Sequence, residues 1–301
     1  MPRVITANPT RSDNMILSEN EQKAAVLHSL RDSMIRHKML TGIVSSIDHV
    51  DSADGTQNYV TVMYNGVDVI IPIAKMGFTK EAMADEHRAN MTANSMAGAE
   101  IDFIVEHVDT DRGVATASRE AAMKQKAKDF FVGDGERPAI VTPGQLVEAR
   151  IIGVMRYSLR LEVLGIEKYV NARTLNREWI SDCTKKYEIG GVIIVRVTKI
   201  DASGEEPDIT IEGAKIHDPF KSGCKVGGRY VGEITGYDKG RFFIHLDNGT
   251  NALAHSSASM EDYLPKPKDI VAFVVSRIQT ENDIDTATGK IVRVIRRSHT
   301  V

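Results

Sequence analysis

A basic stretch near the end of the chain carries the residues best suited to meet a phosphate backbone. Residues 289–301, GKIVRVIRRSHTV, contain four Lys or Arg residues and no acidic residue; they are Lys290, Arg293, Arg296 and Arg297. Cations spaced along one segment can neutralise phosphates. A β-strand with one solvated face produces the same pattern, so this stretch alone does not separate binding from solvation.

Motifs for covalent or metal chemistry are absent from the sequence. It contains no G-x-x-x-x-G-K-S/T loop, no G-x-S-x-G turn and no H-E-x-x-H motif. Cys183 and Cys224 lack Cys or His neighbours at zinc-ligand spacing, and we expect both to be small buried residues. Five aspartates fall in predicted turns, where a turn-stabilising role is sufficient; they are Asp109, Asp111, Asp201, Asp283 and Asp285. We expect a protein that is not an enzyme and needs no cofactor.

Length and composition favour a globular protein of several domains. The 301 residues suit two or three compact domains, and 42% hydrophobic with 26% charged residues is ordinary for such a chain. No apolar run reaches the roughly 18 residues of a membrane span, and the start lacks the apolar core of a signal peptide. We therefore expect a cytoplasmic protein with no membrane partner. The net charge of −3 implies that any nucleic-acid site is local.

The first 38 residues are predicted to be a flexible arm, over residues 1–14, followed by an amphipathic helix. Ser18 is suited to cap that helix, which we expect at 19–37. Apolar residues recur through it at near-helical spacing; they are Ala25, Leu27, Leu30, Met34 and Ile35.

From residue 39 onward, short runs rich in Val and Ile alternate with Gly, Asp and Asn, which is typical of all-β barrels. The pattern occurs three times, each time as an opening strand, a hairpin, an irregular stretch and two closing strands. Asn65-Gly66 and Asn248-Gly249 are strong hairpin signals, and Leu164-Gly165 is a weaker one. Five strands in about 75 residues is the size of an OB-fold barrel.

We therefore predict an all-β protein of three tandem five-stranded OB-fold barrels, with a short N-terminal helix and a helical linker. The barrels are expected at residues 39–120, 144–216 and 217–301. Residues 121–143 should form the helix and linker, because good helix formers there give way to the breakers of 133–143. The joint near 217–225 is short, so we expect the last two barrels to move together and the first to move separately.

Three features, among them GIVSSI at 42–47, NGTNALAHSS at 248–257 and GGVIIVRVTKID at 190–201, resemble the S1 family of RNA-binding OB-fold repeats, found in ribosomal protein S1 and in several ribonucleases. The opening strand of the motif appears as GIVSSI at 42–47 and GEITGY at 232–237. The middle edge appears as GVDVIIPIA at 66–74 and NGTNALAHSS at 248–257, and the closing run appears as GGVIIVRVTKID at 190–201. The resemblance spans most of the chain and implies that the repeats are S1-type barrels.

The resemblance implies an RNA platform in the third repeat. Family repeats carry two aromatic residues on the second and third strands and a histidine on the next strand, and the matching positions are Tyr237, Phe243 and His255. Alternation along a strand favours Phe243 for exposure and Phe242 for the core. Exposed rings stack on unpaired bases. Nearby cations would meet the phosphates; they are Lys239, Arg241, Lys290 and Arg293.

The other two repeats depart from this pattern. In the second, Arg160 stands at a platform position, where an arginine could still stack on a base and pair with a phosphate. Weak RNA contact by Arg156, Arg160 and Arg173 is one alternative, and a purely structural repeat is the other. In the first, Tyr59 fills an aromatic position, but Pro72 replaces the histidine. Family repeats with proline there often serve protein contact, which implies docking on the small ribosomal subunit or another protein. RNA binding through Tyr59 is the alternative for this repeat.

The leading interpretation is a cytoplasmic protein, similar to a short form of ribosomal protein S1, that binds single-stranded RNA and handles mRNA in translation on the small ribosomal subunit. Two alternatives stay open. One is a protein-interaction scaffold built from partly degenerate repeats. The other is an RNA-binding regulator or a nuclease accessory subunit.

Overall fold

The computed structural model describes residues 19–52, 55–109, 113–134, 136–177, 180, 182–255 and 263–298. The arm expected at residues 1–14 lies outside these residues. The chain divides into two compact units. The first unit comprises Met1–Val154, Leu159–Tyr169 and Tyr187–Ile211, and the second comprises Met155–Ser158, Val170–Lys186 and Glu212–Val301. No helix in the described ranges has the length and apolar content that crossing a membrane requires.

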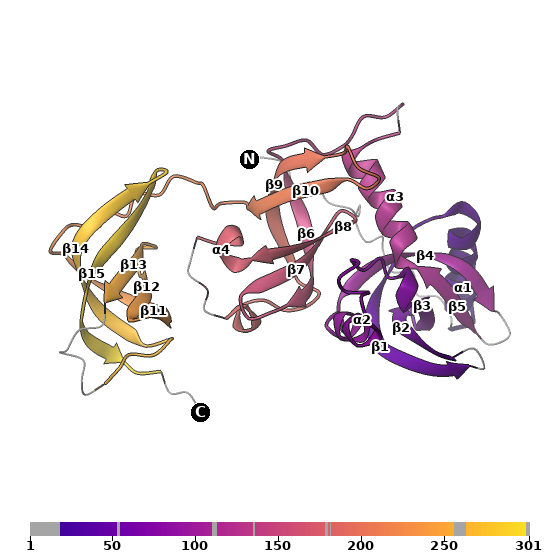
Figure 1. Cartoon of the computed structure of the whole chain (residues 1–301), viewed down its shortest axis with the longest axis horizontal. Helices are drawn as coiled ribbons and strands as arrows, with labels where there is room; N and C mark the ends of the chain where they lie inside the picture. The colour runs from indigo at the N-terminus through magenta and orange to yellow at the C-terminus, as the bar shows by residue number, and fades with distance from the viewer. Residues whose placement is uncertain are drawn as a thin grey trace. The chain divides into compact units, whose positions relative to one another are not determined.

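The first barrel is a closed ring of five strands in the order β1-β2-β3-β5-β4 (Figure 1). The strands are β1 (Leu40–Ser52), β2 (Gly55–Tyr64), β3 (Val67–Pro72), β4 (Glu100–Asp109) and β5 (Val114–Ser118). Asn65 and Gly66 both adopt positive φ in the β2–β3 turn, as the sequence predicted from the Asn-Gly pair. Helix α2 (Glu86–Asn94) lies in the connection between β3 and β4, and Asp85 caps its first turn.

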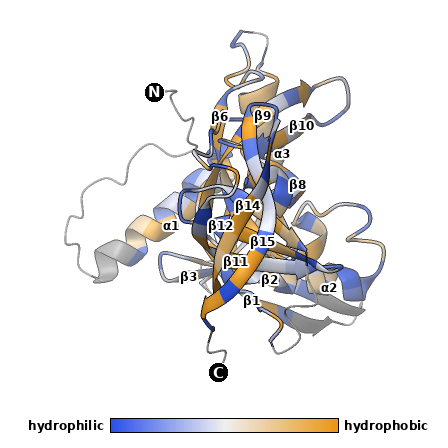
Figure 2. Ribbon diagram, turned by 90° about the vertical axis from the view of Figure 1, so that its left-hand side faces the viewer, coloured by the Kyte–Doolittle hydropathy of each residue, from blue (hydrophilic) through white to orange (hydrophobic). Residues whose placement is uncertain are grey.

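Helix α1 (Glu19–Arg36) contacts β4 of this barrel, and apolar and polar bands alternate along it (Figure 2). Val26, Leu30 and Ser33 are buried, at spacings of four and three residues. The Ser33 hydroxyl accepts a bond from the Val105 backbone N–H over 3.0 Å. The helix was predicted correctly, but Ile35 is 72% exposed and was wrongly assigned to its apolar face, because it lies only two residues past Ser33.

The second repeat is a five-stranded sheet in the order β10-β9-β6-β7-β8. Its strands are β6 (Leu146–Val154), β7 (Ser158–Val163), β8 (Ile166–Asn171), β9 (Val192–Asp201) and β10 (Asp208–Gly213). The order repeats that of the first barrel, but within the described ranges the ring is not closed between β8 and β10. A short helix, α4 (Ala172–Leu175), follows β8, and Asn171 caps it by accepting from the Arg173 N–H.

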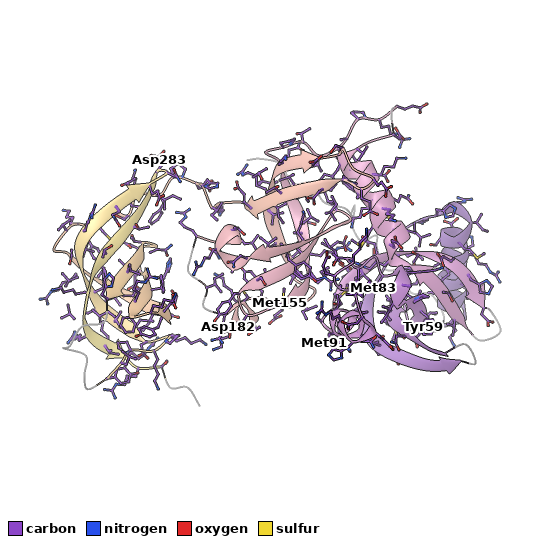
Figure 3. The ribbon with its side chains drawn as sticks, viewed as in Figure 1. Tyr59, Met83, Met91, Met155, Asp182 and Asp283 are labelled. Atoms are coloured by element: carbon purple, nitrogen blue, oxygen red, sulfur yellow. The ribbon has the colours of Figure 1, made fainter. Side chains whose placement is uncertain are left out.

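The third barrel is again closed, in the order β11-β12-β13-β15-β14 (Figure 1). Its strands are β11 (Arg229–Asp238), β12 (Arg241–Leu246), β13 (Asn251–His255), β14 (Ile270–Glu281) and β15 (Ile284–Arg296). Asp283 lies in the turn at the tip of the long β14–β15 hairpin (Figure 3). The mostly-β architecture of three five-stranded sheets with a few short helices confirms the predicted fold class. Cys183 and Cys224 are both buried, as expected, and burial raises the pKa of the Cys183 thiol.

The segment between the first two repeats is packed into the first unit. Helix α3 (Arg119–Phe131) contacts β4, and its Arg119 and Lys126 side chains are buried. Beyond it, the buried Val141 donates its N–H to the Phe130 carbonyl over 2.9 Å. The first barrel, α3 and most of the second sheet therefore form one compact unit. The expectation that the first barrel moves separately from the second repeat stays a prediction, and the packing of α3 in the first unit argues against it.

Candidate nucleic-acid interface

Side-chain alternation along β12 separates the core of the third barrel from its surface. Phe242 is fully buried, as are Ile244 and Leu246. Phe243 and His245 have the opposite parity and are only partly buried, while Arg241 is exposed. Successive side chains on a strand point to opposite faces, so Phe243 lies on the outside of the barrel, as the sequence predicted.

The strand register brings several predicted residues onto one surface. On β12 and β13, Arg241 pairs with His255, Phe243 with Leu253, and His245 with Asn251. On the other side of β13, Leu253 pairs with Thr288 of the parallel strand β15. Continuing that register by two residues sets His255 opposite Lys290, which is exposed. We call this surface the outer face; it consists of Arg241, Phe243, His245, Asn251, Leu253, His255 and Lys290.

His245 is a member of the outer face that the sequence analysis did not select. Its Nδ1 lies 3.2 Å from the Asn251 side-chain oxygen, across the two strands. The signal that could have identified it is its shared parity with Phe243, two residues earlier. A polar ring placed two positions from Phe243 lies on the same side of the strand and extends the surface on which bases could rest.

Tyr237 does not join Phe243 in a single platform. Its backbone pairs with that of Phe242, and its ring centroid lies 4.8 Å from the Phe242 ring. Tyr237 therefore packs against the buried Phe242 near the end of the barrel and remains 45% exposed. The ladder shifts register between Ile234 and Gly236, which changes the alternation along β11 and sets Tyr237 opposite Phe242. The predicted contact of Tyr237 with RNA stays a prediction.

The predicted cations of the third barrel are exposed but not all on one face. Lys239 occupies the β11–β12 turn with φ of 46°. Arg241 Nη2 lies 3.8 Å from Asp238 Oδ2, a surface ion pair of the kind that contributes little stability. Arg293 lies three residues beyond Lys290 and pairs with Ala272 on β14, away from β13. Arg241 and Lys290 are thus the two cations that the register assigns to the outer face.

Arg160 is not at the surface, so the prediction that it contacts RNA is wrong. It is only 2% exposed, and its Nε and Nη2 donate to the Glu167 carboxylate over 2.9 and 3.0 Å. Its Nη1 donates to the Thr92 carbonyl of α2 over 3.2 Å, and the guanidinium lies 5.1 Å from the Phe78 ring centre. Thr92 and Phe78 belong to the first repeat, and within the first unit they cover the Arg160 side chain.

Tyr59 lies partly buried on β2 of the first barrel (Figure 3). The backbone register pairs it with Pro72 on β3. The last pair of the corresponding hairpin in the third barrel is Arg241 with His255. The first barrel thus places an aromatic ring and a proline where the third places a cation and an imidazole.

Comparison with known proteins shows a family similarity that is limited to the second repeat. No curated protein matches the chain. A solved structure described as a multidomain protein with nucleic acid binding domains, from Streptococcus pneumoniae TIGR4, is similar with 11% identity and a TM-score of 0.21, covering 85% of this chain and 73% of that one. Residues 140–212 match the family model described as the S1 RNA binding domain. The second repeat is therefore similar to S1 RNA-binding domains.

Proposed function

We propose that the protein binds single-stranded RNA and that the outer face of the third barrel is its main contact surface. The observation that carries this proposal is Phe243, which points out of a barrel whose core is already filled by Phe242. A base stacked on an exposed aromatic ring gains about 1–3 kcal/mol without sequence readout. The S1 match in the neighbouring repeat supports RNA as the ligand.

The charges around Phe243 favour a strand whose bases are unpaired. Arg241 and Lys290 flank His255 in register, so phosphates can be met on one side of the stacking ring. Two cations are too few to hold a duplex by its backbone alone, given the net charge of −3. In a duplex the bases are already stacked on one another, so Phe243 would have no free base face to meet.

The test is RNA binding by a Phe243→Ala, His255→Ala double variant. We expect an affinity for single-stranded RNA lower by on the order of tenfold to a hundredfold, from the loss of a stacked base and an adjacent polar contact. Val231→Ala is the matched control, since Val231 is an exposed apolar residue on β11 of the same barrel. Circular dichroism should show both variants folded. A folded double variant with wild-type affinity would overturn the proposal.

We further propose that the bound RNA is mRNA and that the protein acts in translation in the cytoplasm, on the small ribosomal subunit, without catalysing a reaction. The resemblance to S1 repeats supports this, as does the Tyr59 and Pro72 pair of the first barrel, which suits a protein contact better than a phosphate. Co-sedimentation of the protein with isolated small subunits, with and without Tyr59→Ala, tests it. Sedimentation with free RNA alone would contradict the ribosomal role.

A protein-interaction scaffold is the second candidate, and the burial of Arg160 favours it. In the repeat that matches the S1 family, this platform position is covered by α2 and Phe78. A repeat whose platform is covered from within its own chain has lost that means of stacking on RNA. If the wild-type protein failed to retain single-stranded RNA at low salt in a filter assay, the scaffold function would replace RNA binding.

A further inference from the structure

A small hollow lies against Phe243 within the second unit. It has a volume of about 150 Å³ and is lined by side chains from the third barrel and from the end of the second repeat; they include Arg173, Asn176, Arg177, Phe243 and Asn251. All of these residues belong to the same compact unit. A water molecule takes up about 30 Å³ in the liquid, so the hollow has room for a larger group.

The two arginines reach the hollow because the chain after β8 turns toward the third barrel. Asn171 caps α4, which carries Arg173, and Arg177 follows two residues after the helix ends. The Asn251 side-chain amide donates to the Arg177 carbonyl over 2.7 Å, which ties this segment to the first residue of β13. Asn251 is also the cross-strand neighbour of His245, so the segment borders the outer face.

Arg177 is held in place by protein contacts that leave part of its guanidinium unused. Its Nη2 donates to the Lys215 carbonyl over 3.3 Å, and the guanidinium carbon lies 5.0 Å from the Phe220 ring centre. Its Nε is buried and has no acceptor within the described ranges. A buried donor without an acceptor costs about 1–3 kcal/mol, and the residue that carries it lines the hollow.

We propose that Arg173 and Arg177 form a phosphate-binding site beside Phe243, so that one RNA strand contacts the second repeat and the third barrel together. A base stacks on Phe243 while an adjacent phosphate oxygen accepts from the two guanidiniums. This inference rests on the proposed RNA-binding function. The sequence suggested only a weak contact of Arg173 with RNA, and the structure adds Arg177 and the hollow beside Phe243. The proposed site also gives the second repeat a part in RNA binding that does not need the covered Arg160.

The test uses the full chain and a labelled single-stranded RNA. Arg173 is exposed, so Arg173→Ala should leave the fold intact while lowering affinity on the order of tenfold. The slope of log K against log salt should fall by roughly 0.7, as expected when one single-strand phosphate contact is lost. Arg173→Glu should weaken binding further, because it adds repulsion. Arg229→Ala is the matched control, as Arg229 is an exposed arginine at the start of β11.

The outcomes separate this proposal from the one on which it rests. Loss of affinity in Arg173→Ala, with a reduced salt slope and an unchanged Arg229→Ala control, supports the composite site. If Phe243→Ala weakened binding and Arg173→Glu did not, the third barrel would bind RNA alone and the composite site would be wrong. Equal losses in Arg173→Ala and Arg229→Ala would show only a general charge effect and would also overturn the phosphate site.

Discussion

The second and third repeats carry different residues at the same predicted platform position, and the surroundings of these two residues are opposite in kind. On β7 the residue is Arg160, which is buried and bonded to Glu167 and to the Thr92 carbonyl. On β12 it is Phe243, which lies on the outer face beside Leu253. The charged residue is thus inside and the aromatic residue outside. Position in a repeat predicts which residues share an element, but the neighbouring segment decides whether a side chain is fully buried.

Arg160 is part of a larger group of buried charges in the first unit. Arg119 on α3 donates to Glu167, at 2.7 Å, and Lys126 on the same helix lies 3.0 Å from Glu162. Arg150 on β6 pairs with Asp102 of β4 at 3.0 Å, and Lys126 also bonds Asp102. These pairs join the first barrel, α3 and the second repeat. Cations here hold the unit together, whereas in the third barrel they remain exposed.

Disrupting this group of buried charges should have the largest effect on stability. Lys126→Met removes the cation shared by Asp102 and Glu162, both of which are buried. Removing one partner of a buried ion pair costs about 3–5 kcal/mol, because the remaining charge loses its compensation. Urea unfolding should show this loss.

Lys124→Met on the same helix is the control for that measurement. Lys124 pairs with Glu120 at the surface, and exposed pairs contribute about 0–1 kcal/mol. If the two variants were equally stable, the buried charges would not hold the first unit together. The contrast between buried cations that stabilise the first unit and exposed cations in the third barrel would then be wrong.

A smaller effect should distinguish the two platform positions directly. Arg160→Met removes three hydrogen bonds but keeps an unbranched apolar side chain, and it leaves Glu167 with Arg119 as its partner. We expect a loss of stability of about 1–3 kcal/mol and no change in RNA affinity. Phe243→Ala should lower RNA affinity without a comparable loss of stability. A drop in RNA affinity for Arg160→Met, in protein shown to be folded, would mean that α2 uncovers this position when RNA binds.

Acid should destabilise the first unit through protonation of Asp102. Burial acts to raise the pKa of Asp102, but Lys126 and Arg150 outweigh it and lower that pKa to about 2, from an ordinary value of 3.8. A carboxyl with a lowered pKa in the folded state stabilises the protein above its unfolded pKa and loses that contribution as the pH falls. Unfolding free energy should therefore decrease between about pH 4 and about pH 2. Asp102→Asn should show a shallower decrease over the same range.

The sequence was sufficient for features that depend on local periodicity. Three hairpins with alternating apolar residues predicted the three sheets, and parity alone separated Phe242 from Phe243. It was not sufficient where a partner lies far along the chain. Lys126 falls within the predicted helix and linker, and nothing near it in the sequence indicated its partner Glu162, which is 36 residues away. Likewise, no local residue pattern indicated the register shift on β11 that sets Tyr237 opposite Phe242.

The smallest expected effect concerns salt, and it tests whether exposed cations or stacking dominate on the outer face. Arg241 and Lys290 lie on that face, and the proposed arginine site adds two more cations. So few cations should give a salt slope of about 2–4, against about 10 for a strongly basic DNA-binding protein. Binding would then rest mainly on stacking, and duplex RNA should bind much more weakly than a single strand at moderate salt. Filter binding over a salt series with both RNAs measures this. A slope of about 8–10, or equal affinity for duplex and single strand, would mean that a basic surface elsewhere on the chain dominates, and Phe243 would lose its role.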